Sequence, residues 1–109
     1  MRQYCSQAAE EARQLATGKG ALTSLYVVNV AAATRYVWVF DNTASSGTVL
    51  CGPFPVAAGQ GVALGWPEGD DMNNSQPRYA TGLRVASSTS ASSFAASGAA
   101  DFRINATFE

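Results

Sequence analysis

From residue 21 to residue 109, apolar and polar positions follow a period of two, which is typical of β-strands. The runs at 21–30 and 34–42 are rich in β-branched and aromatic residues, and the short "AAA" between them suits a hairpin. Further strands are predicted between turn signals at 48–56, 62–66, 78–86 and 100–109. This pattern predicts an all-β protein, an antiparallel β-sandwich of about six to eight short strands.

The first part of the chain has a different period. Its apolar residues recur at helical spacing, at Tyr4, Ala8, Ala12 and Leu15. Gly18 follows as a normal helix stop. The sequence therefore predicts an N-terminal α-helix with a linker in residues 1–20, before a sandwich domain in residues 21–109. The apolar face of this helix is mostly alanine, so we expect it to dock on another surface.

The predicted strand at 34–42 is apolar on both faces. Tyr36, Trp38 and Phe40 point one way, and the valines between them point the other way. One face of a two-sheet sandwich is normally wet, so we expect the helix, a partner, or both to cover this one. The Ser/Thr-rich run at 87–97 precedes a regular last strand, so we expect an ordered connection that Phe94 anchors.

Composition points to a covered surface. Charged residues make up 14% of the chain, against about 25% in typical domains. The net charge is −1 and the seven cations are scattered, which argues against binding to nucleic acid. No apolar run approaches the roughly 18 residues that span a membrane. Residues 1–20 do not have the pattern of a signal peptide, so synthesis in a cytoplasm is expected.

The sequence offers little catalytic chemistry. It has no histidine, and its two cysteines cannot form a zinc site alone. No phosphate-binding loop motif is present. Glu68, Asp70 and Asp71 could offer oxygens to calcium, but their spacing matches no EF-hand and solvated acidic turns are more common. We therefore predict a protein that is not an enzyme, with no catalytic residues, no metal and no cofactor.

Cys5 and Cys51 leave three alternatives open. They can be two buried thiols, as is usual in a protein made in a cytoplasm. They can pair within the chain and tie the N-terminal segment to the sheet. They can also form a link between two chains.

Several segments resemble small bacteriophage virion proteins. The segments "TRYVWVFDNTASSGTVLCGPFPVAAGQGVALGW", "YATGLRVASSTSASSF" and "DFRINATFE" carry the resemblance, which covers about residues 22–109. It implies a β-sandwich used as a virion building block, most simply a capsid decoration (cement) protein that sits on the major capsid protein as a trimer or dimer. A phage tail or baseplate component is the second reading. The N-terminal segment has no counterpart in this pattern.

A protein of this kind acts through contact surfaces. The residues predicted to contact other subunits or virion partners are Tyr4, Leu15, Trp38, Trp66 and Phe94, because aromatic side chains bury large areas at low entropic cost. The alternative is that they belong to the core of the subunit. A rival function is a small carbohydrate-binding module, in which Trp66 and Tyr79, with Asp70 and Asp71, form a sugar platform.

Overall fold

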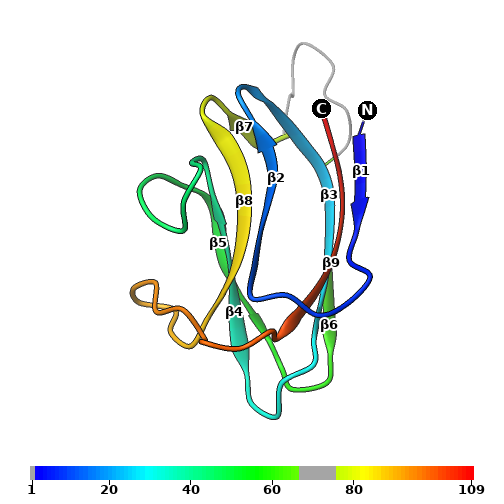
Figure 1. Ribbon diagram of the computed structural model, residues 1–109, viewed down its shortest axis with the longest axis vertical. Coiled ribbons are helices and arrows are strands. Elements are labelled where there is room, and N and C mark those ends of the chain that lie inside the picture. The colour runs from blue at the N-terminus through cyan, green and yellow to red at the C-terminus, as the bar shows by residue number, and fades with distance from the viewer. Residues whose placement is uncertain (1, 67–75) are drawn as a thin grey trace.

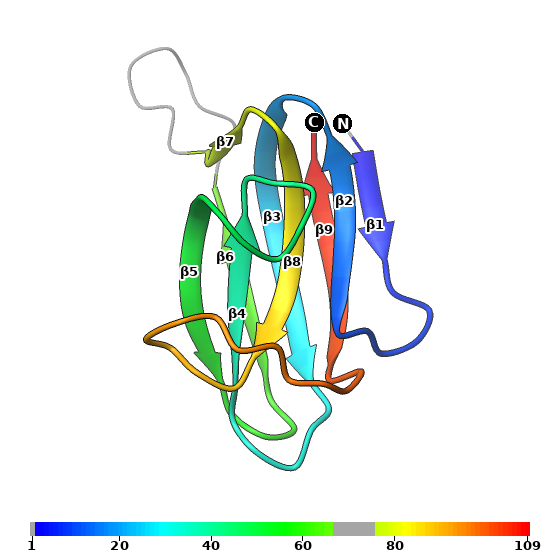
Figure 2. The ribbon, with the colours of Figure 1, turned by 60° about the vertical axis from the view of Figure 1, so that its left-hand side comes forward.

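The chain forms two antiparallel β-sheets that pack face to face (Figures 1 and 2). The computed structural model describes residues 2–66 and 76–109. The strands are β1 (Arg2–Cys5), β2 (Ala12–Thr17), β3 (Gly20–Asn29), β4 (Arg35–Phe40), β5 (Val49–Val56), β6 (Gly61–Gly65), β7 (Arg78–Tyr79), β8 (Gly82–Ser88) and β9 (Phe102–Phe108). The prediction of an all-β sandwich is confirmed, and each predicted strand is present, with 78–86 divided between β7 and β8.

The strand order is that of a jelly roll. One sheet, here called the β1 sheet, has the order β1-β9-β3-β6, with β7 also paired to β3. The other, the β2 sheet, has the order β2-β8-β4-β5. Apart from β7, strands pair first with last: β1 with β9, β2 with β8, β3 with β6 and β4 with β5. This is the pairing of one long hairpin, and rolling it adds the contacts of β3 with β9 and of β4 with β8. Two facing four-stranded sheets made this way are a jelly roll.

The core lies between the two sheets. In β9 the period-two pattern puts Phe102, Ile104 and Phe108 inside, while Arg103 faces out. In β4, Val37 and Val39 point into the same core from the other sheet. The remaining buried core residues are Ala16, Leu22, Leu25, Val27, Val56, Tyr79, Leu83, Val85 and Ala106. Both sheets therefore contribute one apolar face to a single core, as the alternation predicts.

The prediction of an N-terminal helix is wrong. Residues 2–5 form β1 on the edge of one sheet, and residues 12–17 form β2 on the edge of the other. The pairing of β2 with β8 shifts register between Gln14 and Ala16, and both Leu15 and Ala16 pack against the core. This bulge interrupts the period of two, so the apolar spacing imitates a helix. The division into a helix and linker at 1–20 and a separate sandwich at 21–109 fails with it, because β1 and β2 belong to the sandwich.

The Ser/Thr-rich segment covers the outer face of the β2 sheet. Phe94 packs edge-on against Trp38 and Phe40, with ring centroids 5.9 Å and 5.3 Å apart. The indole N–H of Trp38 donates to the carbonyl of Ser90 at 3.0 Å. An isolated bridge pairs Ser88 with Ala96. The expectation of an ordered connection anchored by Phe94 is confirmed, and this segment covers the outer face for which a helix or a partner was expected.

Candidate interaction surface

We searched the described residues for a metal-binding cluster and for a membrane-spanning helix. Within 2–66 and 76–109, no three His, Cys, Asp or Glu side chains come together as a possible metal site. The acidic residues Glu68, Asp70 and Asp71 lie outside the described residues. No helix of the described chain has the length and apolar character needed to cross a membrane. Surfaces and side-chain clusters are therefore the features to compare.

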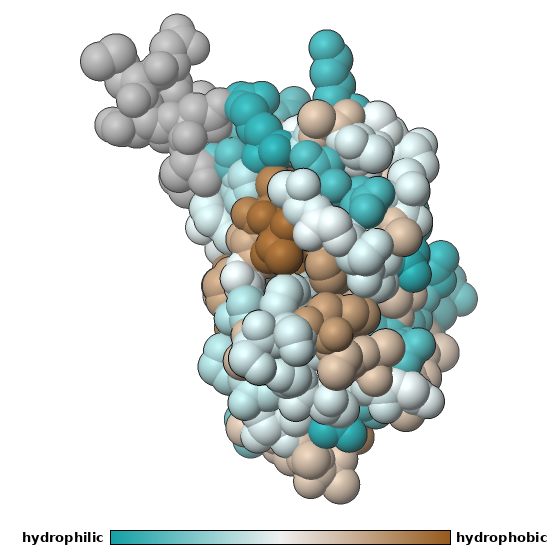
Figure 3. All heavy atoms as spheres, turned by 90° about the vertical axis from the view of Figure 1, so that its left-hand side faces the viewer, coloured by the Kyte–Doolittle hydropathy of each residue, from teal (hydrophilic) through white to brown (hydrophobic). Residues whose placement is uncertain are grey.

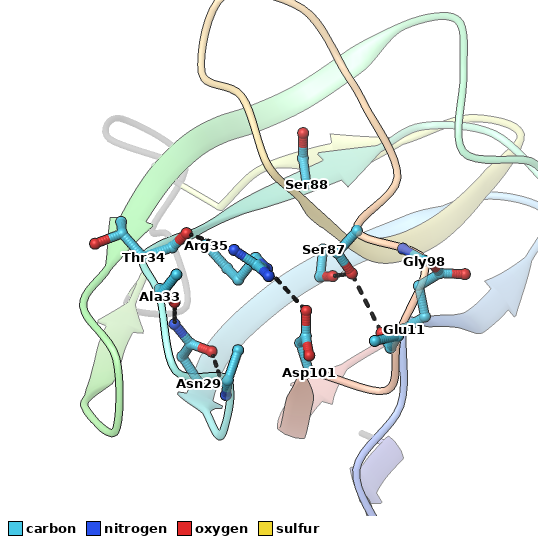
Figure 4. Close-up of polar contacts among 12 residues, drawn as sticks. Glu11, Asn29, Ala33, Thr34, Arg35, Ser87, Ser88, Gly98 and Asp101 are labelled. Atoms are coloured by element: carbon cyan, nitrogen blue, oxygen red, sulfur yellow. Dashed lines mark hydrogen bonds and ion pairs between the residues drawn. The ribbon is translucent and has the colours of Figure 1, made fainter.

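One polar network closes the end of the sandwich (Figure 4). The guanidinium of Arg35, at the start of β4, donates to the carboxylate of Asp101 at 2.8 Å, just before β9. The amide nitrogen of buried Asn29 donates to the carbonyls of Ala33 and Val56 at 2.9 Å each. Every buried side-chain nitrogen and oxygen of the described residues has a partner. This network holds the turns in place through paired buried groups.

A second polar cluster joins the connection between β1 and β2. The hydroxyls of Tyr4 and Ser6 donate to one carboxylate oxygen of Glu10 at 2.5 and 2.6 Å, and Arg13 donates to the other oxygen. Burial by itself raises the pKa of Glu10, but the hydrogen bonds from Arg13, Ser6 and Tyr4 outweigh it and lower the pKa below its usual value. The cluster fixes the chain where it passes from one sheet to the other.

The predicted contact residues fall in different places. Tyr4, Leu15 and Trp66 are half-buried and pack against the core. Trp38 is 8% exposed and lies beneath half-buried Phe94. The structure therefore brings Trp38 and Phe94 together but leaves the other three apart from them. Their roles in contacts between proteins stay a prediction.

The two cysteines are free and lie far apart in the strand order. Cys5 is exposed on β1, which begins the order of one sheet, and Cys51 is half-buried on β5, which ends the order of the other. Figures 1 and 2 show these strands on opposite sides of the molecule. A disulfide requires Cα atoms within about 7 Å, so this fold does not join them within one chain. Burial raises the pKa of the Cys51 thiol to about 11.

The predicted sugar platform does not form among the described residues. Tyr79 is 2% exposed, and its hydroxyl donates to the backbone carbonyl of Glu109. Its ring is therefore in the core and cannot stack on a sugar beside Trp66. Asp70 and Asp71, which were to complete the platform, lie outside the described residues.

The side of the sandwich formed by β5 and β6 is open and apolar. These strands end the two strand orders and are joined by the four residues 57–60. Most of the partly buried hydrophobic residues around the core lie on or beside them: Leu50, Cys51, Phe54, Val62, Leu64 and Trp66. Val49 of β5 is exposed. Figure 3 shows hydrophobic side chains gathered in the middle of the face that carries β5.

Sequence reasoning named Trp66 and Cys51 from this side but missed the others. The available signal was the alternation "GVALG", with Val62 and Leu64 between residues that have little or no side chain. This pattern identifies a strand but does not say that it lies on an edge. That position depends on the sheet order.

The chain was also compared with known proteins. It matches no protein-family model, no curated protein and no solved structure. The resemblance to phage virion proteins thus rests on the strand and turn pattern of the sequence.

Proposed function

We propose that this protein is a non-enzymatic structural component of a virion, most simply a capsid decoration protein that binds and stabilises the head lattice. The strand order supports this, because jelly rolls recur in viral capsid domains. They also occur in lectins and cupins, so the fold alone does not assign the function. The sequence resemblance favours the virion among these alternatives, and this is why we propose it.

The observation that carries the proposal is the outer face of the β1 sheet. The residues that point outward from β1, β9, β3 and β6 are Gln3, Cys5, Ser24, Tyr26, Val28, Gly61, Ala63, Gly65, Arg103, Asn105 and Thr107. Among the outward residues of these four strands Arg103 is the single charged one, and Arg78 of the short strand β7 adds a second charge at one end of the sheet. A broad, almost uncharged sheet face suits burial against another protein. Repetition over a lattice strengthens such contacts through avidity.

The location is tested with particles from the virus that carries the coding sequence. Particles are banded on a density gradient, separated into heads and tails, and analysed by quantitative mass spectrometry. We expect the chain in the head fraction at a fixed ratio to the major capsid protein. Recovery with tails supports the tail or baseplate alternative instead. Absence from every particle fraction contradicts the virion proposal.

The surface is tested with charged variants. Tyr26→Asp puts a carboxylate on the outer face of the β1 sheet, where a lattice contact would bury it, and we expect at least a tenfold loss of binding to heads that lack the chain. Ser92→Asp, on the exposed segment over the other sheet, is the matched control and should bind normally. Equal binding by both variants contradicts the assignment of this face.

The partners and the place of action follow from the same proposal. The partners are the major capsid protein or other virion proteins, together with further copies of the chain as a trimer or dimer. Nucleic acid and membranes are not expected partners. The protein would be made in the host cytoplasm and act in the virion.

A further inference from the structure

Apart from the two-residue β7, four strands of the described residues lie at the ends of the two strand orders, and they are not equally protected against pairing with another strand. β1 is four residues long and begins with Arg2. β2 has a register shift and carries Arg13. β5 contains Pro53 and Pro55 and has two register shifts against β4. Short strands, charges, prolines and bulges are the devices by which edge strands avoid pairing.

β6 has five residues, one more than β1, but it lacks the other devices. Its five residues pair with β3 in continuous register, from Gly61 opposite Val28 to Gly65 opposite Ser24. The strand carries no charge, no proline and no bulge. Among the described residues its other side has no strand neighbour. A regular, uncharged edge of this kind is a template for an added strand.

The backbone groups that face this open edge can be identified. The N–H of Asn29 donates to the carbonyl of Gln60, and the N–H of Trp66 donates to the carbonyl of Thr23. Even-numbered residues therefore bond to β3, because N–H and C=O groups alternate in direction along an antiparallel strand. The backbone groups of Gly61, Ala63 and Gly65 point away from β3, off the edge of the sheet.

These groups are symmetric about Ala63. The sequence "GVALG" has a small residue at the centre, an aliphatic residue on each side and a glycine at each end. A second β6, antiparallel and related by a two-fold axis at Ala63, would place Ala63 opposite Ala63 and Gly61 opposite Gly65. The three N–H and three C=O groups of each copy would then form six hydrogen bonds, three donated by each strand.

The side chains on both faces of β6 are also compatible with pairing to a second copy of the strand. On the outer face Gly61, Ala63 and Gly65 carry at most a methyl group, so their own side chains do not obstruct an added strand, and the ring of Tyr26 on β3 lies over Gly61. On the inner side, Val62 and Leu64 are only half-buried, as are Leu50 and Phe54 on β5. A second copy would cover this apolar seam as well as pair the edge.

We infer that the protein forms a two-fold symmetric dimer through its β6 strands, which join the two β1 sheets into one continuous sheet. This goes beyond the proposed function and does not depend on it, because the same edge would pair in a protein with another role. We assign the added strand to a second copy of this chain because the outward backbone N–H and C=O groups of β6, and the sizes of its side chains, are symmetric about Ala63.

The test is the mass of the purified full chain in solution, with reductant present to exclude a link through Cys5. Light scattering after gel filtration, from about 1 µM to about 1 mM, should show a reversible change from 11.3 kDa to twice that mass. Ala63→Pro removes the central N–H without removing a bond to β3. We expect the dissociation constant of the dimer to rise at least tenfold, while circular dichroism shows that the fold is retained.

Gln3→Pro is the matched control. The N–H of Ser6 donates to Ile104, so even residues of β1 bond to β9 and the N–H of Gln3 also points off an edge. This variant should dimerise like the original chain. A monomer at all concentrations overturns the inference, and so does a dimer or trimer that Ala63→Pro does not weaken.

Amide hydrogen exchange gives a readout that needs no variant. The N–H groups of Gly61, Ala63 and Gly65 should exchange quickly in dilute protein and slowly in concentrated protein, because dimerisation places them in hydrogen bonds. The N–H groups of Val62 and Leu64 already bond to β3 and serve as internal controls. Fast exchange at the three odd positions in an oligomer would place the interface elsewhere and overturn the inference.

Discussion

The two cysteines differ in the surroundings of their sulfur atoms. Because burial raises the pKa of Cys51 to about 11, its reactive thiolate is only about one part in 10⁴ at neutral pH. Cys5 is exposed on β1. We predict that iodoacetamide modifies Cys5 at least tenfold faster than Cys51 in the folded protein, as measured by peptide mass spectrometry. Equal rates in the folded protein would contradict this difference, and equal rates in urea are the control.

Asp41 links the end of β4 to the turn before β8. Its carboxylate accepts from the N–H groups of Thr81 at 2.8 Å, Ala80 at 3.0 Å and Gly82 at 3.2 Å. Burial by itself raises the pKa of Asp41, but these three hydrogen bonds outweigh it and lower the pKa below 3.8. The folded protein therefore favours the ionised carboxylate more than the unfolded chain does.

We predict that Asp41→Ala lowers the free energy of unfolding by about 1–3 kcal/mol at neutral pH, because hydrogen bonds to a charged group are lost. The stabilisation from ionised Asp41 is fully present above the usual pKa and is lost as the pH falls through the lowered one. Urea unfolding should therefore show a smaller difference between the two proteins at about pH 2.5 than at about pH 7. A difference that does not change with pH would show that the charge is not responsible.

At the scale of elements, the segment 89–98 acts as a cover for the β2 sheet. We predict that Phe94→Ala lowers the free energy of unfolding by about 1–2 kcal/mol, since a half-buried ring and two aromatic contacts are lost. Near-ultraviolet circular dichroism should change as Trp38 is uncovered, and proteases should cut the segment sooner. Ser92→Ala, at an exposed position of the same segment, should leave all three measurements unchanged.

Elements were predictable where one period ran without interruption. The alternation in β9 and the aromatic run in β4 identify strands because both patterns continue through the whole element. The helix predicted in the N-terminal segment was wrong for two reasons. Strand pairing with β9 and β8 overrides weak local preferences, and the bulge beside Leu15 breaks the alternation. Alanine has high helix propensity, yet Ala12 and Ala16 lie in β2, where Ala16 is buried in the core.

The surfaces were less predictable than the strands. The doubly apolar character of β4 was visible in the sequence, but not the identity of its cover, which lies more than fifty residues later at Phe94. The open side at β5 and β6 depends on which strands end each sheet. Sheet order is set by pairing between distant segments, and periodicity carries no information about it.

At the scale of the whole molecule, the first-with-last pairing makes folding depend on distant contacts. β1 pairs with β9, and β2 pairs with β8. Chains dominated by such pairing fold in about milliseconds to seconds, because loop closure must precede the contacts that stabilise it. We predict refolding in this range after dilution from urea, followed by stopped-flow tryptophan fluorescence. Complete refolding in microseconds would contradict the claim that the pairing of distant strands limits the folding rate.

The pairing of β1 with β9 also fixes the direction in which attachments would leave the molecule. Arg2 lies opposite Phe108, and both ends of the chain emerge at the same end of the sandwich (Figure 1). The turns between β3 and β4 and between β5 and β6 lie at the far end. A fluorescent protein or peptide epitope fused to either terminus would therefore be displayed on the same side, and one fused to each would be held close enough together for energy transfer.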